Sequence, residues 1–595
     1  GLNQYKKVVV VQEKDMPSGG ALSNPDDQAL VRGIEDEMIE AFGKAIVAPT
    51  CRAGAGGVVD LRYKMLRDSC VDALVAAVEE CKVAGLDLDM SKLLQHTKLF
   101  ASVFVCGFLI SCSEPKSSAQ PEVQAVDVVQ QAVDEKYIWD LTDLYPDNEA
   151  WNSARLEAAK QVEVLAALKG TLGNSAKSFL YAVDSISAVY KDVVRIYIYA
   201  SLMADEDTGN AENAERRQLA LNLYTDIGAS VSWYNPELLS LGEQRISQFI
   251  AAEPGLAKHA FGIENSLRQA PHTLGEDVEA VLAKTGKFLG TSGTVYGVLA
   301  NANLPWPEVT LSDGEVLRLS QYGYSVGRQA VVREDRKMVF DTFWGVWKDF
   351  EATLGTLMDS HIQGLVFRTQ VRGYESSLGR ALFDDNMPEA VYRTLVAEVN
   401  AALPTLHRYF KLRKRMLNID DDMRYYDIYP PLVDLDKTFS IEDSIALTRR
   451  ALEPLGEEFM AAYDLGVSER WMHVYPSKGK RSGAYMSVSA YDVHPYVLLN
   501  HNDDFDSAST FAHEYGHAVH SVLANKAQTW ENAGYSTFIA ETASIMNEML
   551  LQDMVVSEAQ TDKEKLFYLG SGLEALRGTF FRQTMFAEFE LKMNE

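Results

Sequence analysis

The sequence predicts a mainly helical fold with little β structure. Apolar residues recur at helical spacing through most of the chain after about residue 137, and only two short stretches have the composition of strands. Because 595 residues are too many for one small core, we expect two or more subdomains or one large helical body.

Composition excludes several classes of protein. The formal net charge of -28 argues against nucleic-acid binding, which needs a positive face, and gives no reason to expect adhesion to anionic lipid. All cysteines precede residue 113, so neither a disulfide nor a thiol nucleophile can operate in the rest of the chain. Zinc ligands in that part must be histidines or acidic residues. The cysteines are Cys51, Cys70, Cys81, Cys106 and Cys112.

The beginning of the chain differs in character from the rest. Residues 1–89 carry no recognisable motif, and we expect them to be a foreign or upstream segment, with Met90 as the natural start. Residues 90–112 have a short basic start and an apolar run at 99–110 that is too short to span a bilayer. The run leads to Cys112 in a pattern similar to the bacterial lipobox. We interpret 90–112 as a lipoprotein-type signal peptide, with a buried core helix as the alternative.

A lipid on Cys112 would attach the protein to a membrane at the bacterial periplasm, which is the location we expect; the cytoplasm is the alternative. The membrane would be contacted only through this anchor. Residues 113–134 are rich in Ser, Pro, Gln, Glu and Val, which is typical of a flexible tether.

The globular part divides into an N-terminal helical domain at 135–330 and a second domain at 331–595. Asp147 or Asn148 is expected to cap the first long helix. A hairpin with a Ser-Asp-Gly turn is predicted at 309–317, between sets of helices.

Two further elements are predicted in the second domain. Pro388 occupies a favoured position in the first turn of a helix. Residues 494–500 are β-rich and bounded by polar residues, which predicts a strand. Its edge could pair with the backbone of a peptide, or the strand could belong to an ordinary hairpin that packs under the next helix.

That next helix carries His-Glu-x-x-His. It is expected to begin near Asp506, and Gly516 leaves room for close approach of another backbone. Residues four apart share a helix face, so His513 and His517 can bind one metal ion. Glu514 can reach a water on that ion and take its proton, which is how zinc peptidases make their nucleophile.

A third ligand must come from elsewhere in the chain. The metzincin class requires a histidine six residues after His517, and Leu523 stands there, so that class is excluded. Glu541 lies among apolar neighbours in a second predicted helix, which begins near Ser536 or Thr537. A buried acid needs a positively charged partner, which a zinc ion supplies. Two histidines and one carboxylate fill three positions of a tetrahedral zinc site and leave the fourth open for a water.

Five other side chains are candidates for the surroundings of the metal or for substrate contact. Glu548 lies two turns beyond Glu541 and could orient a ligand. His520 is more typical of a structural histidine than of a fourth ligand. Tyr485, His494 and Tyr496 belong to the segments that precede the metal helix.

Several segments resemble the oligoendopeptidase F branch of the thimet oligopeptidase family of zinc metallopeptidases. The similarity covers roughly residues 137–595 and is most specific around the paired histidines. The segments that carry it are 481–485, 495–500, 511–521, 540–544, 547–548 and 581–590.

The resemblance implies a mainly α, clam-like fold with a deep central channel and a small β-sheet beside the active-site helix. It implies one zinc ion (Zn2+) per chain, with His513, His517 and Glu541 as ligands and Glu514 as general base. We therefore expect a zinc metalloendopeptidase that hydrolyses internal bonds of oligopeptides by a zinc-activated water.

The sequence departs from this family at its end. The family places a histidine and tyrosines that stabilise the oxyanion in a segment that should follow Glu595. We therefore expect 331–595 to be a catalytic domain truncated at its C-terminus and poorly active, since oxyanion donors contribute about 10²–10³ in rate. Two alternatives stay open: a metallocarboxypeptidase on a similar helical fold, and a zinc-containing peptide-binding lipoprotein without turnover.

Overall fold

The computed structural model describes residues 134–595, except 434 and 488–489. The expected upstream segment 1–89, the signal peptide 90–112 with Cys112, and all but the last residue of the tether lie outside the described residues. Among the helices that are described, none is both long and apolar enough to cross a membrane.

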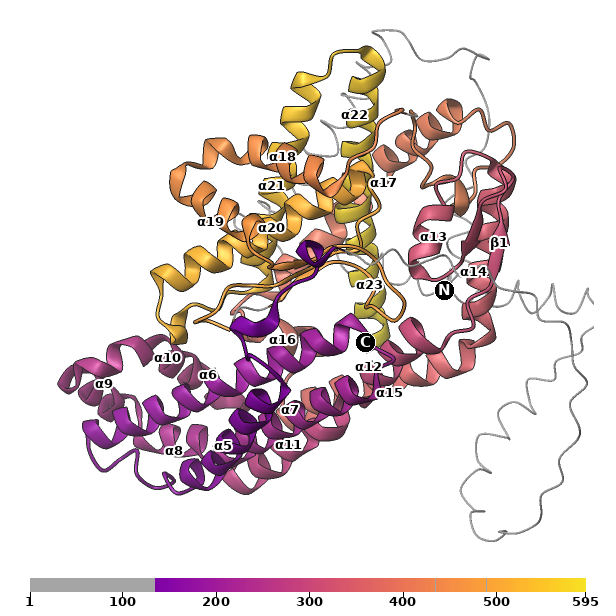
Figure 1. Ribbon diagram of the computed structural model, residues 1–595. Helices are drawn as coiled ribbons and strands as arrows, with labels where there is room; N and C mark the ends of the chain where they lie inside the picture. The colour runs from indigo at the N-terminus through magenta and orange to yellow at the C-terminus, as the bar shows by residue number, and fades with distance from the viewer. Residues whose placement is uncertain (1–133, 434, 488–489) are drawn as a thin grey trace, which may run out of the picture. The chain divides into compact units, whose positions relative to one another are not determined.

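The described chain is mainly helical, as predicted. Its N-terminal part packs around a core that joins α5, α6 and α7 (Figure 1). Asp147 caps α5 by accepting a hydrogen bond of 2.7 Å from the Ala150 amide, which confirms the predicted cap. The helices of this part are α5 (Asn148–Ala166), α6 (Ala176–Glu206), α7 (Ala211–Ser230), α8 (Tyr234–Leu241), α9 (Glu243–Ala252), α10 (Ala260–Arg268), α11 (Glu276–Leu289) and α12 (Thr291–Val298).

The predicted hairpin is present. β1 (Glu308–Thr310) pairs antiparallel with β2 (Val316–Arg318). Gly314 has φ +93° in the turn, a conformation that glycine adopts without strain. Leu317 on β2 is buried in an apolar cluster that includes Phe343 of α14 (Arg333–Asp349).

The following helices build the second half of the described chain. Pro388 stands at the cap of α17 with an extended ψ of 139°, so the prediction that it lies in the first turn is wrong by one residue. The helices are α13 (Gln321–Gly327), α14 (Arg333–Asp349), α15 (Glu351–Val371), α16 (Ser377–Phe383), α17 (Glu389–Met416), α18 (Ile441–Leu452), α19 (Glu457–Ser468), α20 (Phe505–Ala527), α21 (Thr537–Glu558), α22 (Asp562–Leu576) and α23 (Arg582–Asn594).

A small three-stranded sheet lies against α20. Its order is β3 (Met472–His473), β5 (Val497–Leu498) and β4 (Tyr485–Met486), with β5 parallel to β3 and antiparallel to β4. The predicted strand at 494–500 therefore contributes only β5, and β5 is central rather than an edge. One core joins the sheet to Phe511, Tyr515 and other apolar residues of α20.

Candidate metal centre

Helix α20 begins slightly earlier than the sequence predicts. Asp504 is its cap and accepts a hydrogen bond of 2.8 Å from the Ser507 amide. The predicted start near Asp506 is confirmed to within one residue: the helix begins at Phe505, because Asp504 has the extended backbone of a cap, with φ −111° and ψ 171°.

Helices α20 and α21 approach each other closely at Gly516. A Cβ atom on this glycine would lie 2.8 Å from the Cα of Ser544 and 3.0 Å from the carbonyl oxygen of Ala543. Any other residue would push the helices apart, as the sequence predicts. Asn547 of α21 is buried and donates a hydrogen bond of 3.2 Å to the Ala512 carbonyl, which fixes the register of the pair.

This packing brings the three predicted ligands together. His513 Nε2 lies 3.2 Å from His517 Nε2 and 3.3 Å from the nearer carboxylate oxygen of Glu541. His517 Nε2 lies 3.6 Å from the same oxygen. Atoms about 2.0–2.1 Å from a tetrahedral zinc ion lie about 3.3 Å apart, so the spacing of these three atoms fits zinc.

The charges of the trio are strongly coupled. Burial lowers the pKa of His513, but hydrogen bonds with Glu541 and Glu548 outweigh it and raise that pKa to about 10. The hydrogen bond with His513 lowers the pKa of Glu541 to about 2. Burial and the charge of His513 lower the pKa of His517. The group of donors therefore favours one positive charge at its centre, which a proton or a metal ion can supply.

Glu514 is buried beside this group, with 6% of its surface exposed. Burial raises the pKa of its carboxyl to about 7, while the charge of His513 and a hydrogen bond from the Met486 amide oppose the rise. Met486 belongs to β4, so the edge strand of the sheet and the predicted base are in direct contact.

Two side chains orient the ligands. Glu548 Oε1 lies 2.5 Å from His513 Nδ1, at the place that the sequence predicts for a residue that positions a ligand. Ser544 donates a hydrogen bond of 2.8 Å to Glu541 Oε2. The sequence reasoning missed Ser544, although its position three residues after Glu541 puts both on one helix face.

Tyr485 is turned away from the metal group. Its hydroxyl donates a hydrogen bond of 2.8 Å to Asp205 of α6, and the Arg481 guanidinium lies 5.3 Å from its ring. The structure does not bring the Tyr485 hydroxyl to the metal group, because this polar atom is engaged by α6, and its predicted contact with substrate stays a prediction.

His494 and Tyr496 also serve packing rather than the metal group. The His494 ring stacks on Trp471, with the ring centroids 4.5 Å apart and an angle of 2° between the ring planes. Tyr496 is buried and donates a hydrogen bond of 3.0 Å to the Asp140 carbonyl. Both side chains anchor the segment that precedes α5, so the structure does not bring them to the site.

His520 stacks on Tyr535 with ring centroids 4.1 Å apart and belongs to none of the groups of metal donors found in the described residues. A second group of donors consists of Asp184, His259 and Glu531, and the amine of Lys258 lies beside it. This amine is 2.8 Å from Asp184 Oδ1 and 3.4 Å from Glu531 Oε1. Its charge already balances the carboxylates, so this group fits an ion pair network.

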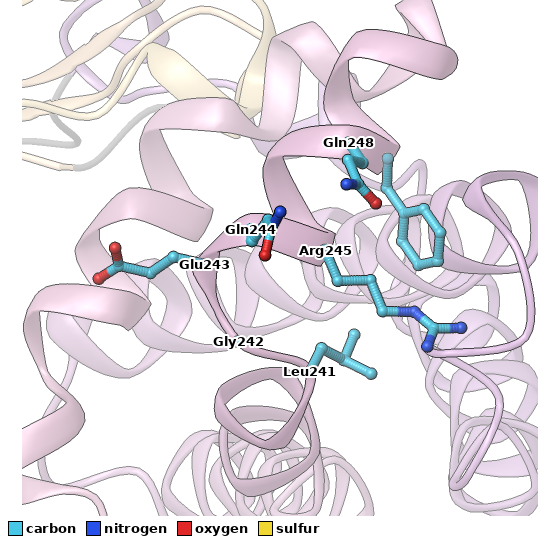
Figure 2. A pocket seen from close by; sticks show the side chains of 7 residues that line it. Leu241, Gly242, Glu243, Gln244, Arg245 and Gln248 are labelled. Atoms are coloured by element: carbon cyan, nitrogen blue, oxygen red, sulfur yellow. The ribbon is translucent and has the colours of Figure 1, made fainter.

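Two cavities of the described chain lie away from the metal group. An open recess of about 600 Å³ is lined by residues 241–249 at the junction of α8 and α9. Figure 2 shows its lining side chains, with Glu243 and Arg245 extending to opposite sides. A second cavity of about 530 Å³ is lined by parts of α6, α7 and α11 and by residues 372–384. Neither contains a residue of the metal group.

The chain is similar in sequence to known peptidases. The model of a family described as Peptidase family M3 matches residues 328–595, and one described as Oligopeptidase F matches residues 237–305. The chain is 36% identical over 453 residues to Oligopeptidase PepF of Bacillus subtilis, covering 76% of this chain and 67% of that protein. It is 33% identical to Group B oligopeptidase PepB of Streptococcus agalactiae, and the match covers 77% of this chain and 76% of that protein.

The chain is also similar to a solved structure. The crystal structure of oligoendopeptidase-F from Enterococcus faecium matches with a TM-score of 0.58 and 30% identity. The match covers 75% of each chain.

Proposed function

The chain belongs to the oligopeptidase F group of peptidase family M3, and from this membership we propose that it is a zinc-dependent endopeptidase that cuts internal bonds of oligopeptides. The observation that carries the proposal is the spacing of the three donor atoms. His513, His517 and Glu541 meet at 3.2–3.6 Å, as the ligands of a tetrahedral zinc ion do.

Zinc would be held by His513, His517 and Glu541, with a fourth position open to substrate or water. A bound zinc ion supplies Lewis acidity, which makes water more acidic and polarises a peptide carbonyl. Glu548 accepts the Nδ1–H of His513 and so keeps Nε2 free for the metal.

Glu514 is the group that moves the proton. Its carboxylate takes a proton from the attacking water and then passes it to the amine that leaves when the peptide bond breaks. Its burial beside the ligands keeps bulk water from competing for this proton.

The outer edge of β4 is the place where a peptide can align. β5 has strands on both sides, whereas no strand of the described chain pairs with the outer side of β4. An extended peptide could therefore add to β4 through backbone hydrogen bonds. Contact between the Met486 amide and Glu514 would put such a peptide next to the proposed base.

The proposal is tested with a short, internally quenched peptide that is blocked at both ends. We expect the zinc-loaded protein to cleave an internal bond, identified by mass spectrometry of the products. Activity only on peptides with a free C-terminus, releasing residues from that end, would make the protein a carboxypeptidase. Tight zinc and peptide binding without products would make it a binding protein. Either result overturns the proposal.

A further inference from the structure

Two arginines and two tyrosines converge from three distant segments of the chain. Arg328 follows α13, Tyr425 and Tyr429 lie in and after the short helix at Tyr425–Asp427, and Arg582 begins α23. The Arg328 guanidinium lies 3.8 Å from the centre of the Tyr429 ring. The hydroxyls of Tyr425 and Tyr429 are 2.9 Å apart.

Neither arginine has an anionic partner. Within residues 134–595 as described, the guanidinium groups of Arg328 and Arg582 lie near aromatic rings, and neither guanidinium forms a hydrogen bond or an ion pair with another residue. Arg328 Nε is buried and unpaired. Nearby, Arg577 shows the usual arrangement, because its guanidinium lies 2.8 Å from the Glu574 carboxylate. A buried donor without a partner is costly, so this pair is suited to an acceptor from outside the chain.

Tyr429 reports the positive potential at this place, whereas burial raises the pKa of its hydrogen-bonded neighbour Tyr425 above the usual range. Burial would raise the pKa of Tyr429, but the charges of the surrounding arginines lower it overall. Tyr425 remains 37% exposed, so solvent and a ligand can reach the cluster.

The charge of Arg328 acts on Asp506 of α20, the helix that also carries two members of the metal group. Asp506 precedes His513 by two helical turns, about 10 Å along the axis and on the same face. The surface of Asp506 is exposed to solvent, although many protein atoms lie around its carboxyl group. The charges of both Arg328 and Glu548 act on Asp506, and Glu548 is the acid that contacts His513.

We propose that Arg328 and Arg582, with the hydroxyls of Tyr425 and Tyr429, bind a carboxylate of the peptide substrate about three residues from the bond that is cut. The separation follows from about 10 Å at about 3.3 Å per extended residue. Guanidinium groups bind carboxylates through paired, charge-assisted hydrogen bonds, and phenol hydroxyls add further donors. Asp506 is a competing negative charge but lies outside ion-pair distance of Arg328 in the described chain.

Two sources can supply this chemistry: the C-terminal carboxylate of a peptide, or the side chain of an aspartate or glutamate. The inference rests on the proposed function for its substrate, but its test needs no turnover. Zinc-loaded Glu514→Gln protein is titrated into fluorescein-labelled short peptides, and binding is read by fluorescence anisotropy. In the first pair of peptides, one ends in a free C-terminal carboxylate and the other in an amide. In the second pair, both peptides end in an amide, and one has an internal glutamate where the other has a glutamine.

We expect one acidic peptide to bind about ten- to a hundredfold more tightly than its neutral partner, the range of a hydrogen-bonded charge pair. The pair that shows the preference identifies the source of the carboxylate. Arg328→Gln and Arg582→Gln, each added to Glu514→Gln, should reduce this preference to less than about threefold while the neutral peptides bind as before. Arg155→Gln is the matched control, since Arg155 also lies near an aromatic ring, 5.9 Å from Trp151, on α5.

Thermal melting shows whether each variant folds. If Arg328→Gln does not fold because the stacking on Tyr429 is lost, Arg582→Gln provides the test. Equal binding of acidic and neutral peptides in both pairs overturns the inference. So does a preference that persists in both arginine variants. If the wild-type protein does not cleave peptides but the carboxylate preference depends on these arginines, the proposed function fails and the inference stands.

Discussion

Glu548 Oε1 lies 2.5 Å from His513 Nδ1, across the interface of α20 and α21. An ionised carboxylate only accepts hydrogen bonds, so Nδ1 carries a proton, and Nε2 is the nitrogen that faces His517 and Glu541 and can exchange its own proton for a metal ion. The tautomer that a metal ion needs is therefore set by a residue on the neighbouring helix.

Glu548→Gln should weaken zinc binding about ten- to a hundredfold, because an amide holds the His513 ring less firmly and lowers its basicity. Competition with a chromophoric chelator measures the affinity. Glu558→Gln is the matched control, since Glu558 ends the same helix and pairs with Arg450. Equal affinities in the two variants would contradict the positioning role of Glu548.

Ser544→Ala should weaken zinc binding by only a fewfold. The serine hydroxyl donates to Glu541 Oε2, and one such hydrogen bond contributes about 0.5–1.5 kcal/mol. The same chelator competition checks the ranking of the variants. A loss larger than that of Glu548→Gln would show that the order of the two supports is reversed.

Gly516→Ala should destabilise the protein by about 1–3 kcal/mol, since the new methyl group would lie 2.8 Å from the Cα of Ser544. Zinc affinity should fall as well, because the displaced helix carries Glu541. Urea denaturation measures the free energy of unfolding.

Gly345→Ala provides the comparison for this substitution. A Cβ at Gly345 on α14 meets no atom within 4 Å, so alanine should be neutral or stabilising by up to about 1 kcal/mol. If both substitutions had the same effect, close helix approach at Gly516 would not be the reason for that glycine.

His473 on β3 should make stability fall in acid. Burial and the charge of Lys480 lower the pKa of His473 to about 3 in the folded protein, against about 6.5 when unfolded. Below pH 6.5 the unfolded chain binds a proton that the folded chain does not, so stability is present at pH 7 and is lost as the pH falls toward 3. The loss at pH 5 is about 2 kcal/mol.

Urea denaturation at pH 7 and pH 5 tests this contribution. His473→Asn should lose less stability between the two pH values than the wild type, whereas replacing the exposed His361 of α15 by asparagine should leave the difference unchanged. Parallel losses in wild type and His473→Asn would remove His473 as a source of acid sensitivity.

The sequence was sufficient for elements whose signals are local. Helical spacing predicts the mainly α fold, and turn composition predicts the hairpin that ends at β2. The histidine pair could be located because four-residue spacing on a helix places both rings on one side. Glu541 is predicted as a buried carboxylate that needs a positive partner, but its side chain is 45% exposed, so that premise is wrong although the residue lies at the metal group.

Other features depend on packing between distant segments. Tyr485 and Tyr496 look like candidates by position, but α6 and the segment before α5 engage their hydroxyls. Sequence order also does not reveal that β5 is central and β4 the edge, because that depends on the parallel pairing of β3 with β5. The charges of Arg328 and Arg582 act on the same side chain, Tyr429, although the three residues are far apart in the sequence, which no local pattern indicates.

The central claim is that one zinc ion held by His513, His517 and Glu541 works with Glu514 as the base. The most direct measurement is the titration of zinc into metal-free wild-type and Glu514→Gln proteins, following metal content and cleavage of the end-blocked peptide together. We predict that both proteins bind one zinc ion, that activity in the wild type rises until one equivalent is bound, and that the Glu514→Gln protein stays at least about a hundredfold less active. Equal activity of the two proteins, or activity that is independent of zinc, would contradict the account.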